Sequence, residues 1–361
     1  MTKRLETGHG PIELPAFMPD ATRAVLRGLD GDDLRACGVQ ALVVNAFHLM
    51  TRPGCGVISR LGGIHRFMGF DGPVASDSGG FQLYSLLCDD PRLGRITDKG
   101  FSFRRAADRP QKMLTPDKCI ARQLQLGSDI VVCLDQCTHP TDGRDRQIQS
   151  VDRTIRWAKR CREVFDQRVE RTGGQALLFA VVQGGADADL RRRCAEQLMG
   201  IGFDGYGFGG WPIDEGGCLI DAVAQVAEIV GPQALKWALG VGKPENVVAA
   251  VAAGYQLLDC AIPTRDARHG RLYVFTDPPD QMALSGKDFY EYVYIQDEVH
   301  VRDERPIDLT CACACCRQYS RGYVHHLFRI RDALAPRLAT IHNLRFYARL
   351  MAELRRRSES A

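Results

Sequence analysis

The sequence predicts an α/β fold, a (β/α)8 barrel of parallel strands with a small appended subdomain near the C-terminus. Three observations predict it. Short, continuous apolar runs recur along roughly the first 260 residues, each run ends at a polar or glycine-rich cluster, and helical patterns lie between the runs. Apolar runs without alternation are typical of strands buried on both faces. Strands that alternate with helices favour a parallel sheet.

The strands are expected in a regular order along the chain. The first lies near residues 15–19, and seven more apolar runs lie at 40–44, 73–76, 129–134, 177–182, 205–208, 235–239 and 255–258. The helical patterns at 221–230 and 244–251 are examples, and the second starts with Pro244 and Glu245, residues that favour a first turn. Eight strands fit a closed barrel better than a doubly wound sheet. A doubly wound nucleotide-binding sheet typically has a Gly-x-Gly-x-x-Gly turn after its first strand, and this region has none.

Composition bounds the class of protein. The chain has 361 residues, of which 45% are hydrophobic and 25% charged, as in ordinary globular proteins. No apolar run is long enough to span a membrane, and residues 1–6 lack the apolar stretch of a signal peptide. We therefore expect a cytoplasmic protein. The net charge is only +3, but arginines gather from Arg317 onward, so a local basic face or a solvated helix is expected there.

Polar residues follow the apolar runs. In a (β/α)8 barrel the carboxyl ends of the strands face one mouth, where active sites are built. The residues expected to converge there are Asn45, Asp77, Asp135, Gln183, Gly209, Gly210 and Asp259. A single Asp after a strand is often a helix cap. Three of them, each directly after an apolar run, favour a shared site.

These residue types indicate glycosidic chemistry. Two facing carboxylates, Asp77 and Asp259, allow one to attack an anomeric carbon while the other moves the proton. The alternative for this pair is an ion-pair network with Arg265 or Arg268. An amide such as Gln183, which both donates and accepts, suits the edge of a purine-like base. Basic residues beside Asp259 suit a substrate that carries phosphate.

A cysteine cluster indicates a metal site. Cys311, Cys313 and Cys316 follow a Cys-x-Cys-x-x-Cys spacing, and a structural zinc takes four thiolate or imidazole ligands. Cys315 is one candidate for the fourth ligand, although its neighbour Cys316 makes the spacing poor. The histidine candidates are His325, His326 and His342. We expect one structural Zn²⁺, with a disulfide or a chance cluster as the alternative.

Several segments together resemble one known family. They are Asn45–Leu49 with Arg52–Gly54, Ser76–Gln82, Leu134–Thr138, Val182–Gly185, Gly209–Gly210, Gly240–Pro244, Leu258–Arg265, the cysteine run, Tyr323–Leu327 and His342–Leu344. In order and over about residues 10 to 350, they resemble the tRNA-guanine transglycosylases, or queuine tRNA-ribosyltransferases, of bacterial type. The resemblance implies a barrel at 1–300, a zinc-binding subdomain at 301–345 and a C-terminal helix at 346–361 that returns to the barrel.

The resemblance also implies roles for single residues. Asp259 matches the nucleophile and Asp77 the general acid/base. The base-pocket residues it implies are Asn45, Phe81, Asp135, Gln183, Gly209, Gly210 and Glu215. The positions that grip the tRNA anticodon loop are Lys243, Arg265 and Arg268, and the zinc ligands are Cys311, Cys313, Cys316 and His342. Members commonly form homodimers.

The implied reaction is a base exchange in tRNA. Guanine at the wobble position of GUN-anticodon tRNAs is replaced by a 7-deazaguanine, either the pre-queuosine base or queuine, through a covalent Asp–ribose intermediate. One alternative is exchange in DNA. A second is a non-catalytic tRNA-binding subunit, and the intact Asp77 and Asp259 argue against that second alternative. The chain departs from the family pattern at Phe81, Gln136, Trp211 and Ile213, and in the segment 104–109. These departures concern substrate choice.

Overall fold

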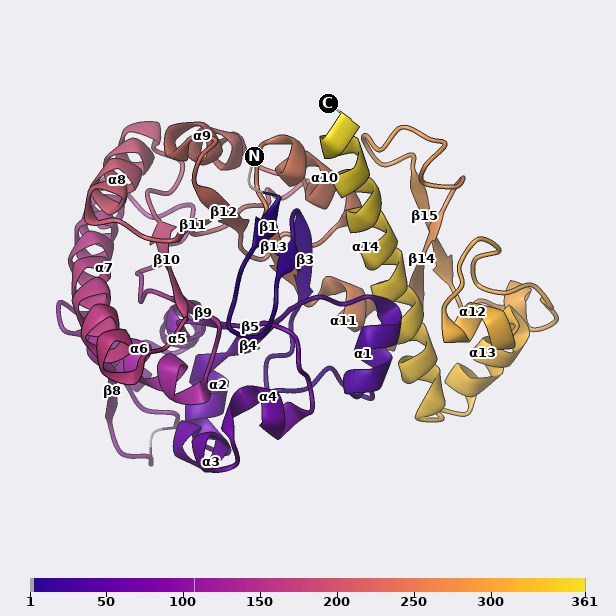
Figure 1. The fold of residues 1–361 in the computed structure, drawn as a ribbon, viewed down its shortest axis with the longest axis horizontal. Helices are drawn as coiled ribbons and strands as arrows, with labels where there is room; N and C mark the ends of the chain where they lie inside the picture. Colours follow the sequence, from indigo (N-terminus) through magenta and orange to yellow (C-terminus); the bar gives the residue numbers. More distant parts are fainter. Residues whose placement is uncertain (1–2, 107, 361) are drawn as a thin grey trace.

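The computed structural model describes residues 3–106 and 108–360. Its centre is a sheet of eight parallel strands, drawn in Figure 1. They are β3 (Ala16–Pro19), β4 (Leu42–Asn45), β5 (Val74–Asp77), β9 (Ile130–Val132), β10 (Leu177–Val182), β11 (Gly205–Phe208), β12 (Leu235–Ala238) and β13 (Leu257–Cys260). Each falls within or beside the run expected to form it, so the eight predicted strands are confirmed.

The sheet closes on itself. Hydrogen-bonded neighbours follow the order β3-β13-β12-β11-β10-β9-β5-β4. The two ends of that series also meet, because Asp20 forms a parallel bridge with Val43 and the Ala21 amide donates to the Val43 carbonyl at 2.7 Å. The predicted (β/α)8 barrel is therefore confirmed, and the doubly wound alternative is wrong.

Helices follow the strands and surround the barrel (Figure 1). They are α1 (Gly31–Cys37), α2 (Ala46–Thr51), α3 (Cys55–Arg60), α4 (Gly63–Met68), α5 (Gly80–Asp89), α6 (Pro116–Leu126), α7 (Arg144–Thr172), α8 (Ala188–Ile201), α9 (Asp221–Val230), α10 (Pro244–Ala252) and α11 (Ile262–Arg268). Local signals set their ends. In α6, Thr115 accepts from the Lys118 amide at the start, and Gly127 adopts the left-handed conformation at the end.

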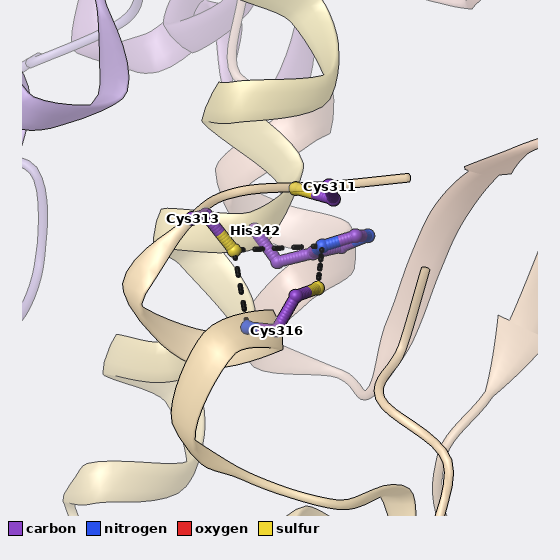
Figure 2. Close-up of side chains that lie close together, drawn as sticks. All are labelled: Cys311, Cys313, Cys316 and His342. Atoms are coloured by element: carbon purple, nitrogen blue, oxygen red, sulfur yellow. Dashed lines mark hydrogen bonds between the residues drawn. The ribbon is translucent and has the colours of Figure 1, made fainter. Parts of the chain in front are cut away.

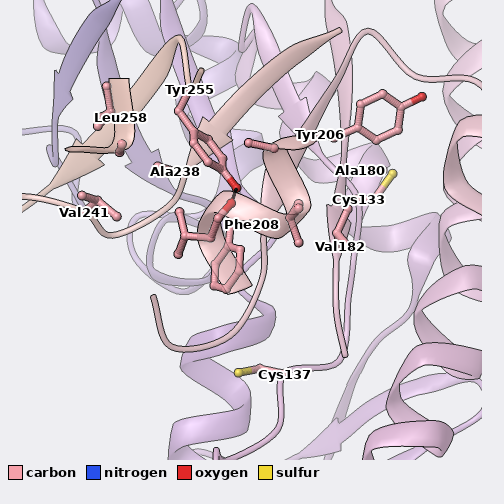
Figure 3. Close-up of a cluster of buried hydrophobic side chains, with 14 of the residues drawn as sticks. Cys133, Cys137, Ala180, Val182, Tyr206, Phe208, Ala238, Val241, Tyr255 and Leu258 are labelled. Atoms are coloured by element: carbon pink, nitrogen blue, oxygen red, sulfur yellow. Dashed lines mark hydrogen bonds between the residues drawn. The ribbon is translucent and has the colours of Figure 1, made fainter. Parts of the chain in front are cut away.

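Two layers of apolar side chains hold the barrel. Alternate strand residues point inward, where Met18, Phe179 and Trp237 belong to one buried cluster. The short strands β1 (Arg4–Leu5) and β2 (Ile12–Glu13) add Leu5 and Ile12 to the same cluster. The other strand residues point toward the helices, and Figure 3 shows part of that outer layer around Phe208 and Tyr255.

Two short insertions accompany the barrel. Between α5 and α6 the chain forms a 3-10 turn, η1 (Pro91–Leu93), and a three-stranded antiparallel sheet of β6 (Gly94–Thr97), β7 (Gly100–Phe103) and β8 (Lys112–Leu114). After α11 it forms an antiparallel pair, β14 (Arg271–Phe275) and β15 (Tyr290–Tyr294). The segment 104–109, which departs from the family pattern, lies in the loop between β7 and β8, and its residue 107 lies outside the described residues.

The C-terminal part packs beside the barrel. It contains η2 (Glu298–His300), α12 (Ala314–Gln318), α13 (Arg321–Arg329) and the 27-residue helix α14 (Leu334–Ser360). In Figure 1 the yellow helix α14 runs between the barrel, near α1 and α11, and the pair α12–α13. The expected division at residues 345/346 falls inside this one helix. Among the described helices, none combines the length and apolar character needed to cross a membrane.

Candidate active site and metal centre

Strand alternation places the predicted carboxylates inside the barrel mouth. Ala75 points into the barrel's inner cluster, so Asp77, two residues on along β5, points the same way. Leu257 belongs to the same inner cluster and Asp259 follows it on β13 by the same spacing. Both aspartates stand at the carboxyl ends of their strands, which is where barrel enzymes build their sites.

One cavity of about 460 Å³ opens at this mouth. Eight of the predicted residues line it, namely Asn45, Asp77, Phe81, Asp135, Gln183, Gly209, Gly210 and Asp259. They come from six different strand ends and from the first turn of α5. Glu215, Lys243, Arg265 and Arg268 do not line this cavity. A volume of this size suits a single small molecule or one nucleotide base.

Asp77 is held by its neighbours on β4 and α2. Asn45, paired with it in register across β4 and β5, donates from Nδ2 to Oδ2 at 2.7 Å, and the Ala46 amide donates to Oδ1 at 3.1 Å. Burial in the cavity wall raises the pKa of Asp77 to about 8, helped by the negative charges of Asp20 and Asp259 and opposed by hydrogen bonds from the Ala46 and Gly79 backbone. The carboxyl group is therefore suited to give and take a proton near neutral pH.

Asp259 has different partners. Trp237 donates from Nε1 to its Oδ1 at 2.8 Å, and the Gly240 amide donates to the same oxygen at 3.2 Å. Burial raises the pKa of Asp259 to about 7, while the two donors favour its ionised form. Both donors bond Oδ1. Two carboxyl groups with different surroundings are thus ready for different roles.

A third carboxylate pairs with the predicted amide. Gln183 donates from Nε2 to Oδ2 of Asp135 at 2.7 Å, and Ser78 donates from Oγ to Oδ1 at 3.5 Å. Burial raises the pKa of Asp135 to about 6. The Gln183 Oε1 atom is buried and has no hydrogen-bond partner, so an acceptor is left for a ligand. This edge offers the donor and acceptor pattern that a purine-like base needs.

Aromatic rings cover another wall of the cavity. Phe81 and Trp211 are both partly exposed, and their rings meet edge to face with centroids 5.6 Å apart. Trp211 also contacts the His139 ring and donates from Nε1 to the Thr138 carbonyl at 3.2 Å. Glu215 is exposed and lies outside the cavity lining.

The cationic residues form a rim beside the site. Arg265 and Arg27 lie close enough to Arg268 to lower its pKa by repulsion, after burial as the main cause. His48 lines the cavity, and burial, followed by the Arg23 and Arg105 charges, lowers its pKa. Arg23, Arg27 and Arg105 were not predicted. Arginines that act on groups at and beside the cavity suit a polyanion.

The sequence reasoning also missed residues that hold the site. Asp20 lines the cavity and directly follows the predicted strand 15–19. The pattern that predicted Asp77, a polar residue directly after an apolar run, therefore also applies to Asp20. Arg191 is buried and donates to the carbonyls of Val182, Gly185 and Gly209 at 2.6 to 2.9 Å, which ties the loops after β10 and β11 together. An arginine inside a helix gave no such signal. Gln136 accepts from Arg153 on α7 and does not line the cavity.

Four residues form a buried cluster suited to a metal ion. Cys311, Cys313, Cys316 and His342 offer ligand atoms that all lie within 4.8 Å of one another (Figure 2). His342 donates from Nε2 to the Tyr273 carbonyl at 2.8 Å when its Nδ1 is unprotonated, and Nδ1 faces the Cys316 Sγ at 3.2 Å. A carbonyl partner of this kind fixes the imidazole for metal binding. The other candidates, Cys315, His325 and His326, lie outside the cluster.

A second group of metal-ligand type lies at the opposite end of the barrel. His9 and His65 contact opposite oxygens of Asp129, which precedes β9, at 2.8 and 2.9 Å. The two rings are stacked with centroids 3.4 Å apart and planes 13° apart. An imidazole binds a metal within its ring plane, and two parallel stacked rings cannot share one ion that way. We interpret this group as a hydrogen-bonded anchor for the N-terminal segment.

A closed parallel barrel with two aspartates beside a base-sized cavity defines an enzyme of the glycosyl-transfer class. Comparison with known proteins narrows that class. The family described as "Queuine tRNA-ribosyltransferase" matches residues 2–359. The chain therefore belongs to this family of pentosyltransferases, and the predicted resemblance is confirmed.

Individual relatives agree with the family match. A queuine tRNA-ribosyltransferase of Methylacidiphilum infernorum is 39% identical over 360 residues, which cover 98% of this chain and 90% of the relative. That of Solidesulfovibrio magneticus is 39% identical and covers 98% and 89%. That of Ruegeria pomeroyi is 38% identical and covers 97% and 88%.

Proposed function

We propose that this enzyme replaces guanine at the wobble position of GUN-anticodon tRNAs with a 7-deazaguanine base, by double displacement. The observation that carries the proposal is the convergence of Asp77, Asp259 and the Asp135–Gln183 pair on one cavity. Membership in the family supports tRNA as the substrate.

The two aspartates divide the work. Asp259 attacks C1′ of the ribose, the bond from C1′ to the guanine nitrogen breaks, and Asp77 gives its proton to the departing base. The incoming base then gives a proton back to Asp77 and attacks C1′, and the ester to Asp259 breaks. Two inversions retain the configuration at C1′. The raised pKa values of Asp77 and Asp259, about 8 and about 7, suit this exchange near neutral pH.

The rest of the cavity recognises the base. Asp135 and Gln183 meet its polar edge, and the backbone of Gly209 and Gly210 lines the same wall. Phe81 is placed to stack on the ring, and Asn45 holds Asp77 rather than the base. Since Glu215 is exposed and outside the lining, it would have to move to contact a 7-substituent. Both the pre-queuosine base and queuine therefore remain candidates.

The tRNA is held by the basic rim. Lys243, Arg265 and Arg268 are proposed to contact anticodon-loop phosphates, joined by Arg27. Phosphate contacts release counterions, so binding falls as salt rises. Because tRNA is used in the cytoplasm, we also propose that the enzyme is cytoplasmic.

The cysteine–histidine cluster is proposed to hold one structural Zn²⁺. Three thiolates and one imidazole form a closed tetrahedral set with no open position for a reaction. Zinc would then tie the loop at residues 311–316 to α14, which carries His342. It would stabilise the subdomain and take no part in the exchange.

The enzyme is proposed to act as a homodimer. Six of its exposed large apolar side chains lie between residues 294 and 330, namely Tyr294, Val299, Val301, Leu309, Tyr323 and Ile330. Contiguous exposed apolar patches mark interaction sites, and we propose that these six side chains contribute to one. Light scattering of the wild type and of Leu309→Lys would show whether that part pairs two copies.

One assay separates the proposed function from its competitors. Labelled guanine in an anticodon stem–loop is offered against the pre-queuosine base, queuine and the archaeosine precursor, and a DNA of the same sequence is run in parallel. Exchange in RNA alone supports the proposal. Exchange in DNA alone would replace it with the DNA activity, and binding without any exchange would indicate a non-catalytic subunit.

A further inference from the structure

A further carboxyl group, that of Asp20, lies where β3 and β4 meet and close the barrel. Asp20 follows β3 directly, and β3 pairs with β13, where Met18 is opposite Asp259. On its other side Asp20 is bridged to Val43 of β4, the strand whose Asn45 holds Asp77. Asp20 therefore lies between the strand that carries Asp259 and the strand that positions Asp77.

Asp20 faces the same cavity and is held in place. It lines the cavity together with Asp77 and Asp259, and the Thr22 hydroxyl lies 2.7 and 2.8 Å from its two oxygens. Its charge acts on both reacting carboxyls, because it raises the pKa of each. The other charged or titratable groups that its charge reaches are His48, Cys260 and Arg268.

We propose that Asp20 is a positioning residue of the base exchange, whose negative charge disfavours the state in which Asp77 and Asp259 are both ionised, so that the pair retains one proton. The inference rests on the proposed function of this site. With Asp135, four carboxyl groups line this cavity, and each added negative charge makes the others ionise less readily. Asp77 then stays protonated and ready to give its proton to the leaving base, without any contact between Asp20 and that base.

The test is the pH profile of exchange for Asp20→Asn. Removal of the charge lowers the pKa of both neighbours, so both limbs of the profile move to lower pH, by about half a unit or more. Asp20→Glu restores the wild-type limbs. The matched control is Asp277→Asn, the same change at an exposed position after β14, and it moves neither limb. Asp20→Ser takes the place of Asp20→Asn if the latter does not fold.

Two results would overturn the inference. A lower rate with unmoved limbs would make Asp20 merely structural. A raised KM for RNA with unmoved limbs would make it a ribose contact instead. A second measurement needs no activity. At pH 8.5 the carboxyl groups ionise and repel one another, and Asp20→Asn removes one of these charges. The Tm of Asp20→Asn minus that of wild type is therefore expected to be larger at pH 8.5 than at pH 5. If the wild type shows no exchange at all, the proposed function fails, whereas the comparison of Tm values still tests whether the Asp20 charge repels those of Asp77 and Asp259.

Discussion

Asn45 and Asp77 lie opposite each other on adjacent strands, and the amide of one donates to the carboxyl group of the other at 2.7 Å. Asn45 does two things at once, because its Oδ1 also accepts from the His48 amide at 3.0 Å and caps α2. The same side chain thus starts a helix and orients the proposed general acid/base.

Replacement of Asn45 by Ala is expected to affect both stability and pH response. Loss of the cap costs about 1 kcal/mol in the free energy of unfolding. Loss of the hydrogen bond to the ionised form raises the pKa of Asp77 further, so the basic limb of exchange moves to higher pH. That direction is opposite to the one expected for Asp20→Asn. Urea unfolding and a rate profile from pH 6 to 10 measure the two effects, and a basic limb that moved down would contradict the assigned role.

Asp259→Asn is expected to abolish exchange, by at least about 10³-fold in kcat, since it removes the carboxylate proposed to form the ester. The asparagine side chain has nearly the same shape as aspartate, so the variant should still fold. Denaturing gels of enzyme mixed with RNA report the covalent complex, which wild type forms and the variant lacks. A trapped complex in Asp259→Asn would assign the nucleophile to another residue.

The wild-type exchange rate is expected to follow a bell-shaped pH profile. Ionisation of Asp259, whose pKa is about 7, makes the rate rise from acid pH, and ionisation of Asp77, whose pKa is about 8, makes it fall above that value. The two groups influence each other, so the limbs report the pair. Single-turnover exchange of labelled guanine provides the profile. A rate that kept rising beyond pH 9.5 would exclude Asp77 as the proton donor.

Asp135→Asn is expected to weaken base recognition while it leaves the reacting pair intact. Loss of the charged acceptor for the Gln183 amide and for the base costs about 1 to 3 kcal/mol, or roughly 5- to 150-fold in kcat/KM. The effect should appear with every base tested, whereas Trp211→Leu should change the preference between bases of different 7-substituent. Equal kinetics in Asp135→Asn and wild type would remove Asp135 from the pocket.

Cys316→Ser is expected to lower bound zinc well below one ion per chain and to lower the Tm, because metal binding contributes directly to folding. The control is Cys315→Ser, which changes the adjacent buried thiol outside the cluster and should keep the metal. Elemental analysis and thermal unfolding, with and without a chelator, provide the measurements. Equal loss of metal in both variants would disprove the four-ligand set.

The sequence by itself determined the barrel and the location of its mouth. Buried parallel strands must be apolar on both faces, so eight such runs were visible, and the polar residue after each run had to lie at one end of the sheet. That logic placed Asp77, Asp135, Gln183 and Asp259 together. The resemblance of the motifs then supplied the roles that we propose for Asp259 and Asp77.

Only the tertiary structure decided which distant groups meet. His342 belongs to the metal cluster because α14 packs against the loop of Cys311–Cys316, a contact that spacing alone left open between three histidines. Asp20 lines the same cavity as Asp77 because β3 and β4 close the barrel. Glu215 lies outside the cavity because its loop carries it to the surface. Periodicity sets the face of a strand or helix, whereas the pairing of faces depends on the packing of the whole chain.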